Sequence, residues 1–258
     1  MVSIVFAMNS GIAGTITRPV QYPTVESAFL DATTNTPTLF GVPVKISAAG
    51  KLRAITAGDT FIKIAGFLVR PYPTSGNGTD GLGVAVPNTT FPADLLKNGY
   101  IAVQVNNYAV NAPTKNGSVY VRVGNPSGVK VIGGIEAAGD IAVTAAATVG
   151  TGTQTAGTLS ATDVTPAGVY TVKMLTGTTF QVTSAGGAVL LTGGVFATQY
   201  TLDNGLSFKM TTGGTPTAGD TTAITVTQNT ISLTAFGVNT YFTGGADANG
   251  ISEIAYNV

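Results

Sequence analysis

The residue types that most often carry enzyme chemistry are missing from this sequence. It contains no histidine and no cysteine. A Ser-His-Asp triad, a Cys-His pair and a zinc site with nitrogen or sulfur ligands are therefore excluded. Two carboxylates at one site would still suffice for glycoside hydrolysis. The twelve acidic residues are dispersed, however, and most stand beside Gly, Asn or Thr in turn-like segments. We therefore expect a protein that is not an enzyme.

One short motif resembles a metal site. Asp247-Ala248-Asn249-Gly250 matches the start of a calcium-binding loop. A complete EF-hand loop also needs a Glu at its twelfth position, and here that position is Val258. A tight turn with Asn-Gly at its tip explains the motif better. Glycine-rich stretches such as residues 81–83 precede no predicted helix, which argues against a phosphate-binding loop. The sequence predicts no metal, nucleotide or organic cofactor.

Two segments supply the candidate interface residues. Residues 70–73, Arg-Pro-Tyr-Pro, follow an apolar run, and proline stiffens such a segment in an extended conformation. The segment is either a loop that ends a strand or a rigid contact with a Tyr anchor, which interfaces favour. Residues 1–19 are rich in strand-forming residues and uncharged until Arg18, so we expect them to add to a sheet edge of a neighbour. The candidate interface residues are Arg18, Pro19, Arg70, Pro71 and Tyr72.

The composition and charge of the chain limit the kinds of partner that these residues could contact. Of the 258 residues 44% are hydrophobic and only 9% are charged, with a net charge of zero. The charge is scattered, so no basic run can follow a phosphate backbone and nucleic acid is not an expected partner. The N-terminal apolar stretch has no preceding positive charge and is too short to cross a bilayer, so neither a secretory signal nor a membrane partner is expected.

Strand patterns dominate the sequence. Alternating apolar residues mark 42–46, 100–105 and 118–123, and a long apolar run covers 60–69. Asn-Gly and Asp-Gly pairs between them suit tight hairpin turns. Capping residues favour two short helices, at 24–32 and 92–98. The residues expected in the core are Phe61, Ile62, Ile64, Phe67, Val103, Val119, Val121, Ile135 and Ile254; Phe61 and Ile62 cannot both face inward from one flat strand.

The composition changes near Ile141. From there to about Gln228 charged residues are few, and Thr, Gly and Ala dominate. Five or six short strand patterns in this stretch indicate a small antiparallel sandwich. Ala-Gly-Asp, which recurs at Ala57, Ala138 and Ala218, is explained by a turn whose Asp bonds its own backbone and starts a strand.

Several segments together resemble the structural cement proteins of tailed-phage heads; they are residues 11–19, 40–44, 66–73, 99–103, 117–123, 133–138 and 242–257. The stretch between resembles a β module found inserted in phage head proteins, through residues 168–172, 179–182, 206–209 and 218–220. The expected fold is all-β, with a discontinuous β-barrel or sandwich-like core domain (1–141 and 229–258) and an inserted small antiparallel β-sandwich module (142–228).

The resemblance implies a function without catalytic residues. It implies a capsid cement or decoration protein that binds the outer surface of the head and stabilises the expanded shell. Its partners would be the major capsid protein and further copies of itself, and it would be made in the host cytoplasm and end up on the virion. We expect the core to dock and the module to project outward. The rival interpretations are a head fibre that binds a host receptor or glycan and a tail-tube or baseplate component.

Overall fold

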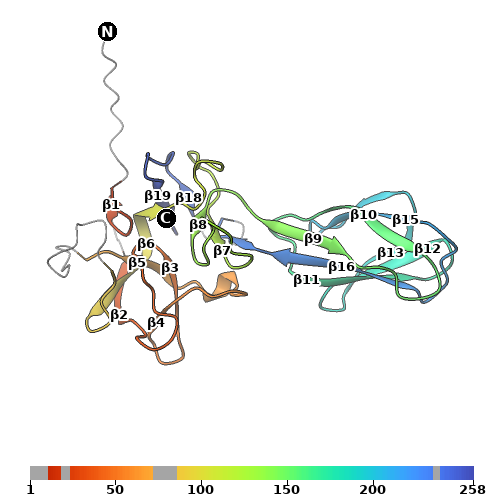
Figure 1. The fold of residues 1–258 in the computed structure, drawn as a ribbon, viewed down its shortest axis with the longest axis horizontal. Helices are drawn as coiled ribbons and strands as arrows, with labels where there is room; N and C mark the ends of the chain where they lie inside the picture. The colour runs from red at the N-terminus through yellow and green to blue at the C-terminus, as the bar shows by residue number, and fades with distance from the viewer. Residues whose placement is uncertain (1–10, 19–23, 72–85, 235–238) are drawn as a thin grey trace, which may run out of the picture. The chain divides into compact units, whose positions relative to one another are not determined.

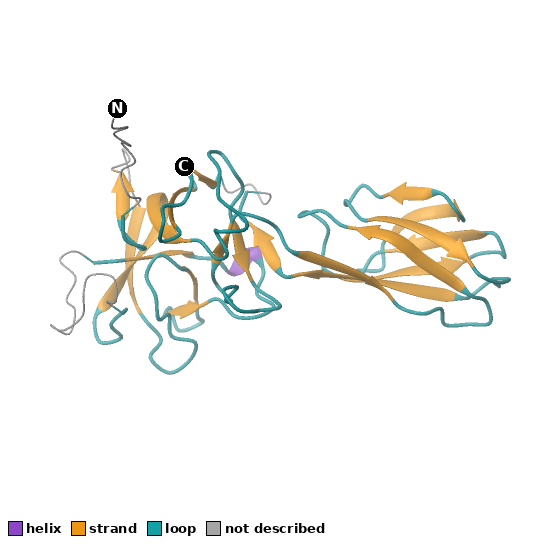
Figure 2. Cartoon of the chain, turned by 45° about the horizontal axis from the view of Figure 1, so that its top comes forward, coloured by secondary structure: helices purple, strands orange, loops and turns teal. Residues whose placement is uncertain are grey.

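The computed structural model describes residues 11–18, 24–71, 86–234 and 239–258. Strands make up 46% of the chain and helix 1%. The predicted all-β class is therefore confirmed, as Figures 1 and 2 show.

The chain divides into two compact units. Unit 1 consists of Met1–Gly139 together with Thr230–Val258, and unit 2 consists of Asp140–Asn229. The functional division of labour between a docking core and a projecting module stays a prediction.

Unit 1 is built on a sheet organised around its longest strand. Its elements are β1 (Ile16–Arg18), β2 (Thr24–Phe29), β3 (Pro43–Ile46), β4 (Leu52–Ala54), the 3-10 helix η1 (Phe61–Lys63), β5 (Gly66–Val69), β6 (Pro92–Gln104), β7 (Tyr120–Arg122), β8 (Ile135–Glu136), β17 (Thr230–Ser232), β18 (Tyr241–Phe242) and β19 (Ile251–Tyr256). The main sheet has the order β18-β19-β6-β5-β3-β4, and β1 and β2 also pair with β6. A second sheet has the order β17-β7-β8.

Strand β6 holds the main sheet together because different partners use its two halves. The first half pairs with β2 and β5, and the second half pairs with β19 and β1, all antiparallel (Figure 1). Among the described residues these sheets close no barrel, so of the two predicted architectures the sandwich-like one holds.

The two helices expected in this region are wrong. Residues 24–29 and 92–98 are instead strands that pair with each other, with Val25 opposite Leu96 and Phe29 opposite Pro92. The capping residues in these segments are local signals, and they cannot stabilise a helix of only two turns by themselves. Pairing between strands about seventy residues apart in sequence outweighs that weak preference.

Most of the expected core residues lie in the main cluster of unit 1. Buried there are Phe67, Val103, Val119, Val121, Ile135 and Ile254. Phe61 and Ile64 are half-buried and pack against the same cluster. Ile62 is wrong: its side chain is 87% exposed. The run 60–69 is not one strand, because residues 61–63 form η1 and only the last four form β5.

Unit 2 packs two antiparallel sheets around one apolar cluster. Its strands are β9 (Ile141–Ala145), β10 (Gln154–Ser160), β11 (Gly168–Met174), β12 (Thr179–Thr183), β13 (Val189–Val195), β14 (Gln199–Thr201), β15 (Ser207–Thr212) and β16 (Thr221–Gln228). One sheet has the order β13-β12-β11-β16-β9 and the other β10-β15-β14. Tyr170, Phe180 and Phe208 are fully buried between them.

The two ends of unit 2 lie side by side. The backbone N of Asn229 donates to the carbonyl of Asp140 at 2.9 Å, and its side-chain amide donates to the Asp140 carboxylate at 3.2 Å. Next to them, Ile141 of β9 pairs with Gln228 of β16 (Figure 1). The chain therefore enters and leaves unit 2 at one place.

The Ala-Gly-Asp tripeptide forms the expected turn at its first and third occurrences. The Asp59 carboxylate accepts a hydrogen bond from the backbone N of Thr56 at 2.7 Å, and Asp220 accepts one from the backbone N of Thr217 at 2.8 Å. The chain then enters β16 after Asp220, as predicted. After Asp59 it enters η1 and no strand, so that part of the prediction is wrong.

Asp220 also fastens a neighbouring loop of unit 2. Its carboxylate accepts further bonds from the backbone N of Thr151 at 3.0 Å and of Gly152 at 2.9 Å. A Cβ at Gly152 would lie 2.6 Å from the carboxylate, so only glycine permits this approach. The backbone hydrogen bonds, that from Thr217 foremost, lower the pKa of Asp220.

Replacing Asp220 by Asn should destabilise unit 2 in a pH-dependent way. An unfolded Asp has a pKa of about 3.9, and the folded pKa of Asp220 lies lower. The carboxylate's stabilisation is thus complete above the unfolded pKa and lost as the pH falls through the folded pKa. We expect Asp220→Asn to lower the Tm of unit 2 by about 5 °C at pH 7, with the difference from the wild type shrinking below about pH 4.

Calorimetry between pH 7 and pH 2 measures this difference. Asp203→Asn, at an exposed position of the same unit, is the matched control and should leave the Tm unchanged. A difference between Asp220→Asn and the wild type that stays constant over the whole pH range would show that the carboxylate charge is not the cause.

Candidate interface site

Arg18 anchors the start of the described chain to the main sheet. Its guanidinium forms an ion pair with Glu253 of β19 at 2.6 Å and a second hydrogen bond to the same carboxylate at 3.2 Å. It also lies over the ring of Tyr100 in β6, 5.1 Å from the ring centre. Its side chain remains 55% exposed. Arg18 thus joins β1 to the sheet and still presents part of its side chain to solvent.

Arg70 holds the same segment at another point. Its backbone N donates to the carbonyl of Gly14 at 2.8 Å, and its Nε donates to the carbonyl of Ala13 at 3.4 Å. The guanidinium lies over the ring of Phe40, 5.1 Å from its centre. Burial lowers the pKa of Arg70. The next residue, Pro71, is exposed.

The candidate interface residues do not converge on one partner. Arg18 contacts β6 and β19, whereas Arg70 contacts the turn before β1 and Phe40. Pro19 and Tyr72 lie outside the described residues. What the two arginines share is that both hold residues 13–18 in place. Their role in binding another protein stays a prediction.

A hollow beside this segment was not foreseen from the sequence. One part has a volume of about 400 Å³, and its walls include Gly11, Ile12, Phe40 and Arg70. A second part of about 280 Å³ is lined by Thr36, Pro37, Thr38, Leu39, Val42, Pro43, Ala54, Ile55, Gln104, Asn106, Val131, Ile132, Gly133 and Gly134. Both parts share Leu39, Val42 and Gln104, so they adjoin. We call them together the Leu39 hollow.

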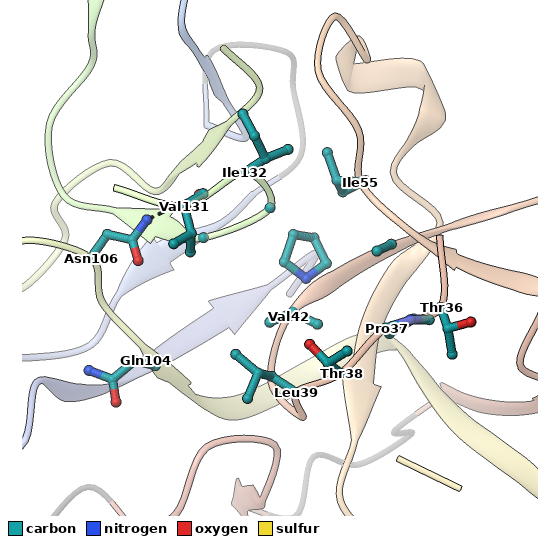
Figure 3. A pocket seen from close by; sticks show the side chains of 14 residues that line it. Thr36, Pro37, Thr38, Leu39, Val42, Ile55, Gln104, Asn106, Val131 and Ile132 are labelled. Atoms are coloured by element: carbon teal, nitrogen blue, oxygen red, sulfur yellow. Dashed lines mark hydrogen bonds between the residues drawn. The ribbon is translucent and has the colours of Figure 1, made fainter. Parts of the chain in front are cut away.

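The second part of the Leu39 hollow is apolar and has no charged residue in its lining. Figure 3 shows Leu39 at the hollow from one segment of unit 1 and Val131 and Ile132 from another. Two of these side chains are still largely open to solvent, Leu39 at 54% and Val131 at 49%. Contiguous apolar surface of this kind on a soluble protein commonly marks a binding site.

A charged network fixes the loop that carries Leu39. The Asp31 carboxylate accepts bonds from the backbone N of Thr33 at 3.0 Å and from Arg53, whose ion pair measures 2.6 Å. The hydroxyl of Thr36 donates to the Asp31 carbonyl at 2.5 Å. The hydrogen bonds, that from the Thr33 backbone first, lower the pKa of Asp31. These contacts tie Asp31 to Thr36, the residue at which the chain enters the lining of the hollow.

A second charged network fixes the loop that carries Val131. Arg122 of β7 and Glu136 of β8 form a buried two-point ion pair, in which Nη2 lies 2.9 Å from Oε2 and Nε donates to Oε1. Arg122 is 0% and Glu136 3% exposed. The other terminal nitrogen of Arg122 donates to the carbonyls of Gly124 and Asn125 at 3.0 and 3.2 Å. The pair thus fixes both ends of the loop between β7 and β8.

Other kinds of site are not found in the part of the chain that the structure describes. Within it, no three His, Cys, Asp or Glu side chains gather as metal ligands would. In the same described residues, no helix has the length and hydropathy needed to span a bilayer. The Asp247 motif is the turn that the sequence suggested, because its carboxylate accepts from the backbone N of Asn249 and of Ile251, each at 2.9 Å.

Comparison with curated proteins finds no match. Among solved structures, the chain is similar to the crystal structure of Xanthomonas campestris FlgL at 16% identity over 86% of this chain. It spans about half of that protein, 49%, and the TM-score is 0.25. A TM-score this low does not indicate a shared fold.

Comparison with family models gives a match over more than half of the chain. The model is described as XM1 gp53 minor capsid protein, and it matches residues 1–173 of 258. The matched region runs past Gly139 into unit 2 and ends within β11, so it does not follow the boundary between the units. A structural role in the phage capsid agrees with a chain that lacks histidine and cysteine. By this match the chain belongs to the XM1 gp53 minor capsid protein family.

Proposed function

We propose that this protein is a cement or decoration protein that binds the outer surface of the phage head and stabilises the expanded shell. The observation that carries the proposal is the family match, which assigns a structural role in the capsid. The absence of histidine and cysteine supports a role that is not enzymatic. The low charge supports assembly, because a chain in which only 9% of the residues are charged repels copies of itself only weakly.

The mechanism of stabilisation follows from mass action. A protein that binds the expanded shell but not its precursor or its opened form favours the expanded form by its binding free energy. Many copies at equivalent positions on one shell resist opening together, even where each contact is weak. The major capsid protein is the proposed partner, with further copies of this chain second. In this arrangement unit 1 docks to the shell and unit 2 projects from it.

Purified heads that lack this protein test the proposal. Mixed with the purified chain, they should bind it in a fixed stoichiometry that saturates, as measured by co-sedimentation. Bound heads should also release their DNA at a higher temperature than bare heads. Binding to host cells without binding to heads would contradict the proposal and favour a head fibre that recognises a receptor or glycan.

A further inference from the structure

We propose that the Leu39 hollow binds the N-terminal segment of the same chain, with Val2–Met8 as the part that docks. The hollow is lined by residues of unit 1 alone, and its occupancy does not depend on binding to the phage head.

The hollow has the chemistry of a peptide-binding groove. Leu39, Val42, Ile55, Val131 and Ile132 supply apolar walls, and the second part of the hollow has no charged lining residue. A charged segment would lose its hydration there without gaining an ion pair, so the occupant must be uncharged. Gln104, Asn106 and two threonines add polar groups at the wall, and an extended backbone needs such groups for its own N–H and C=O.

The N-terminal segment has the matching composition and begins at the right place. Seven of residues 1–10, MVSIVFAMNS, are apolar and none is charged. Gly11, to which the segment is attached, is itself part of the wall of the hollow. Ten extended residues reach about 33 Å. Attachment at the wall also gives the segment a high effective concentration, so in dilute solution it outcompetes a segment from another copy.

The walls of the hollow are held in place before the segment binds. The Asp31 network fixes the loop with Leu39, and the Arg122–Glu136 pair fixes the loop with Val131. A groove that needs no ordering on binding loses less conformational entropy.

A labelled peptide of residues 1–10 tests the assignment on the full-length protein. The double variant Ile4→Asp/Phe6→Asp should release the protein's own segment, because it places two charges against the second part of the hollow, whose lining has no charged residue. Fluorescence anisotropy should then show the peptide binding this variant at least ten times more tightly than the wild type. Asn9→Asp/Ser10→Asp adds the same charge just outside Val2–Met8 and should behave as the wild type does.

A second pair of variants locates the binding site. Leu39→Asp, added to Ile4→Asp/Phe6→Asp, should weaken peptide binding at least tenfold. Val110→Asp, at a position of unit 1 that is 75% exposed and outside both lining sets, should not. The proposal is overturned if the peptide binds the wild type and Ile4→Asp/Phe6→Asp equally, or binds neither. It is also overturned if adding Leu39→Asp leaves peptide binding unchanged. Because no phage heads are used, such a failure leaves the proposed function untouched.

The absence of native cysteine allows a separate test of which copy supplies the segment. Phe6→Cys combined with Val131→Cys should form a disulfide within one chain on mild oxidation, seen as a monomer without free thiols. Disulfide-linked dimers at the same dilution would assign the segment to a neighbouring copy and overturn the assignment to the same chain. Circular dichroism of every variant verifies that the fold is retained.

Discussion

Replacing Glu136 by Gln should destabilise unit 1 by about 3–5 kcal/mol, the largest effect that we expect from a single substitution. The reason is that Arg122, which is fully buried, would keep its charge and lose its two-point ion pair with the Glu136 carboxylate. The Arg122 bonds to the carbonyls of Gly124 and Asn125 would remain, but a neutral partner cannot balance a guanidinium out of water. Arg122→Met should cost a similar amount, since it leaves the Glu136 carboxylate buried.

Urea unfolding, followed by hydrogen exchange and mass spectrometry of the β7 and β8 peptides, measures this loss for unit 1. Peptides from unit 2 provide an internal reference whose midpoint should not move. Lys97→Met is the matched control, because its pair with Glu26 is 3.6 Å long and both side chains reach solvent, at 30% and 56% exposure. It should change the free energy of unfolding by less than about 0.5 kcal/mol. Arg122→Met/Glu136→Leu should recover most of the loss. If Glu136→Gln costs no more than Lys97→Met, the pair does not support unit 1.

Removing unit 2 as a whole should leave unit 1 folded and able to bind heads. The variant joins Gly139 to Thr230 through a short Gly/Ser linker in place of residues 140–229. Because the carbonyl of Asp140 and the backbone N of Asn229 lie 2.9 Å apart, the linker bridges a very small gap. Closing so short a loop costs little entropy. Unit 1 also has apolar clusters that belong to it alone.

Two measurements verify this result. The β7 and β8 peptides of the shortened protein should keep their protection from hydrogen exchange, and the protein should still co-sediment with heads, with an affinity within about tenfold of the full chain. A matched deletion of residues 1–15 should weaken head binding more than the loss of unit 2. If the shortened protein folds but no longer binds, while isolated unit 2 does, the proposed roles of the two units are reversed.

Alternating residues predicted several strands, but they did not predict how the second face of each strand is buried. The alternation in 118–123 correctly placed Val119 and Val121 inside. It also implied an outward Arg122, which is in fact buried and pairs with Glu136 of β8, the neighbouring strand in the same sheet. Periodicity within one strand contains no information about the side chains that a neighbouring strand brings beside it. The same limit explains the two wrong helices, since capping residues are local whereas the pairing of β2 with β6 is not.

The candidate site was predictable only in part. Proline beside Arg70 correctly indicated the end of a strand, which β5 reaches at Val69. The contact of Arg70 with Phe40 and the Leu39 hollow depend on segments brought together from residues 36–43, 54–55, 104–106 and 131–134. No single segment among these looks unusual in sequence. Such a surface becomes visible only once the fold is known.

The adjacent ends of unit 2 have a mechanical consequence. If a swelling shell pulls Gly139 and Thr230 apart, the load falls on β9 and β16 at their shared end, where Ile141 faces Gln228. An antiparallel pair pulled from one end opens like a zipper, because its hydrogen bonds bear the force one after another and never all at once. Force applied at this end would therefore separate β9 from β16 stepwise, one residue pair at a time.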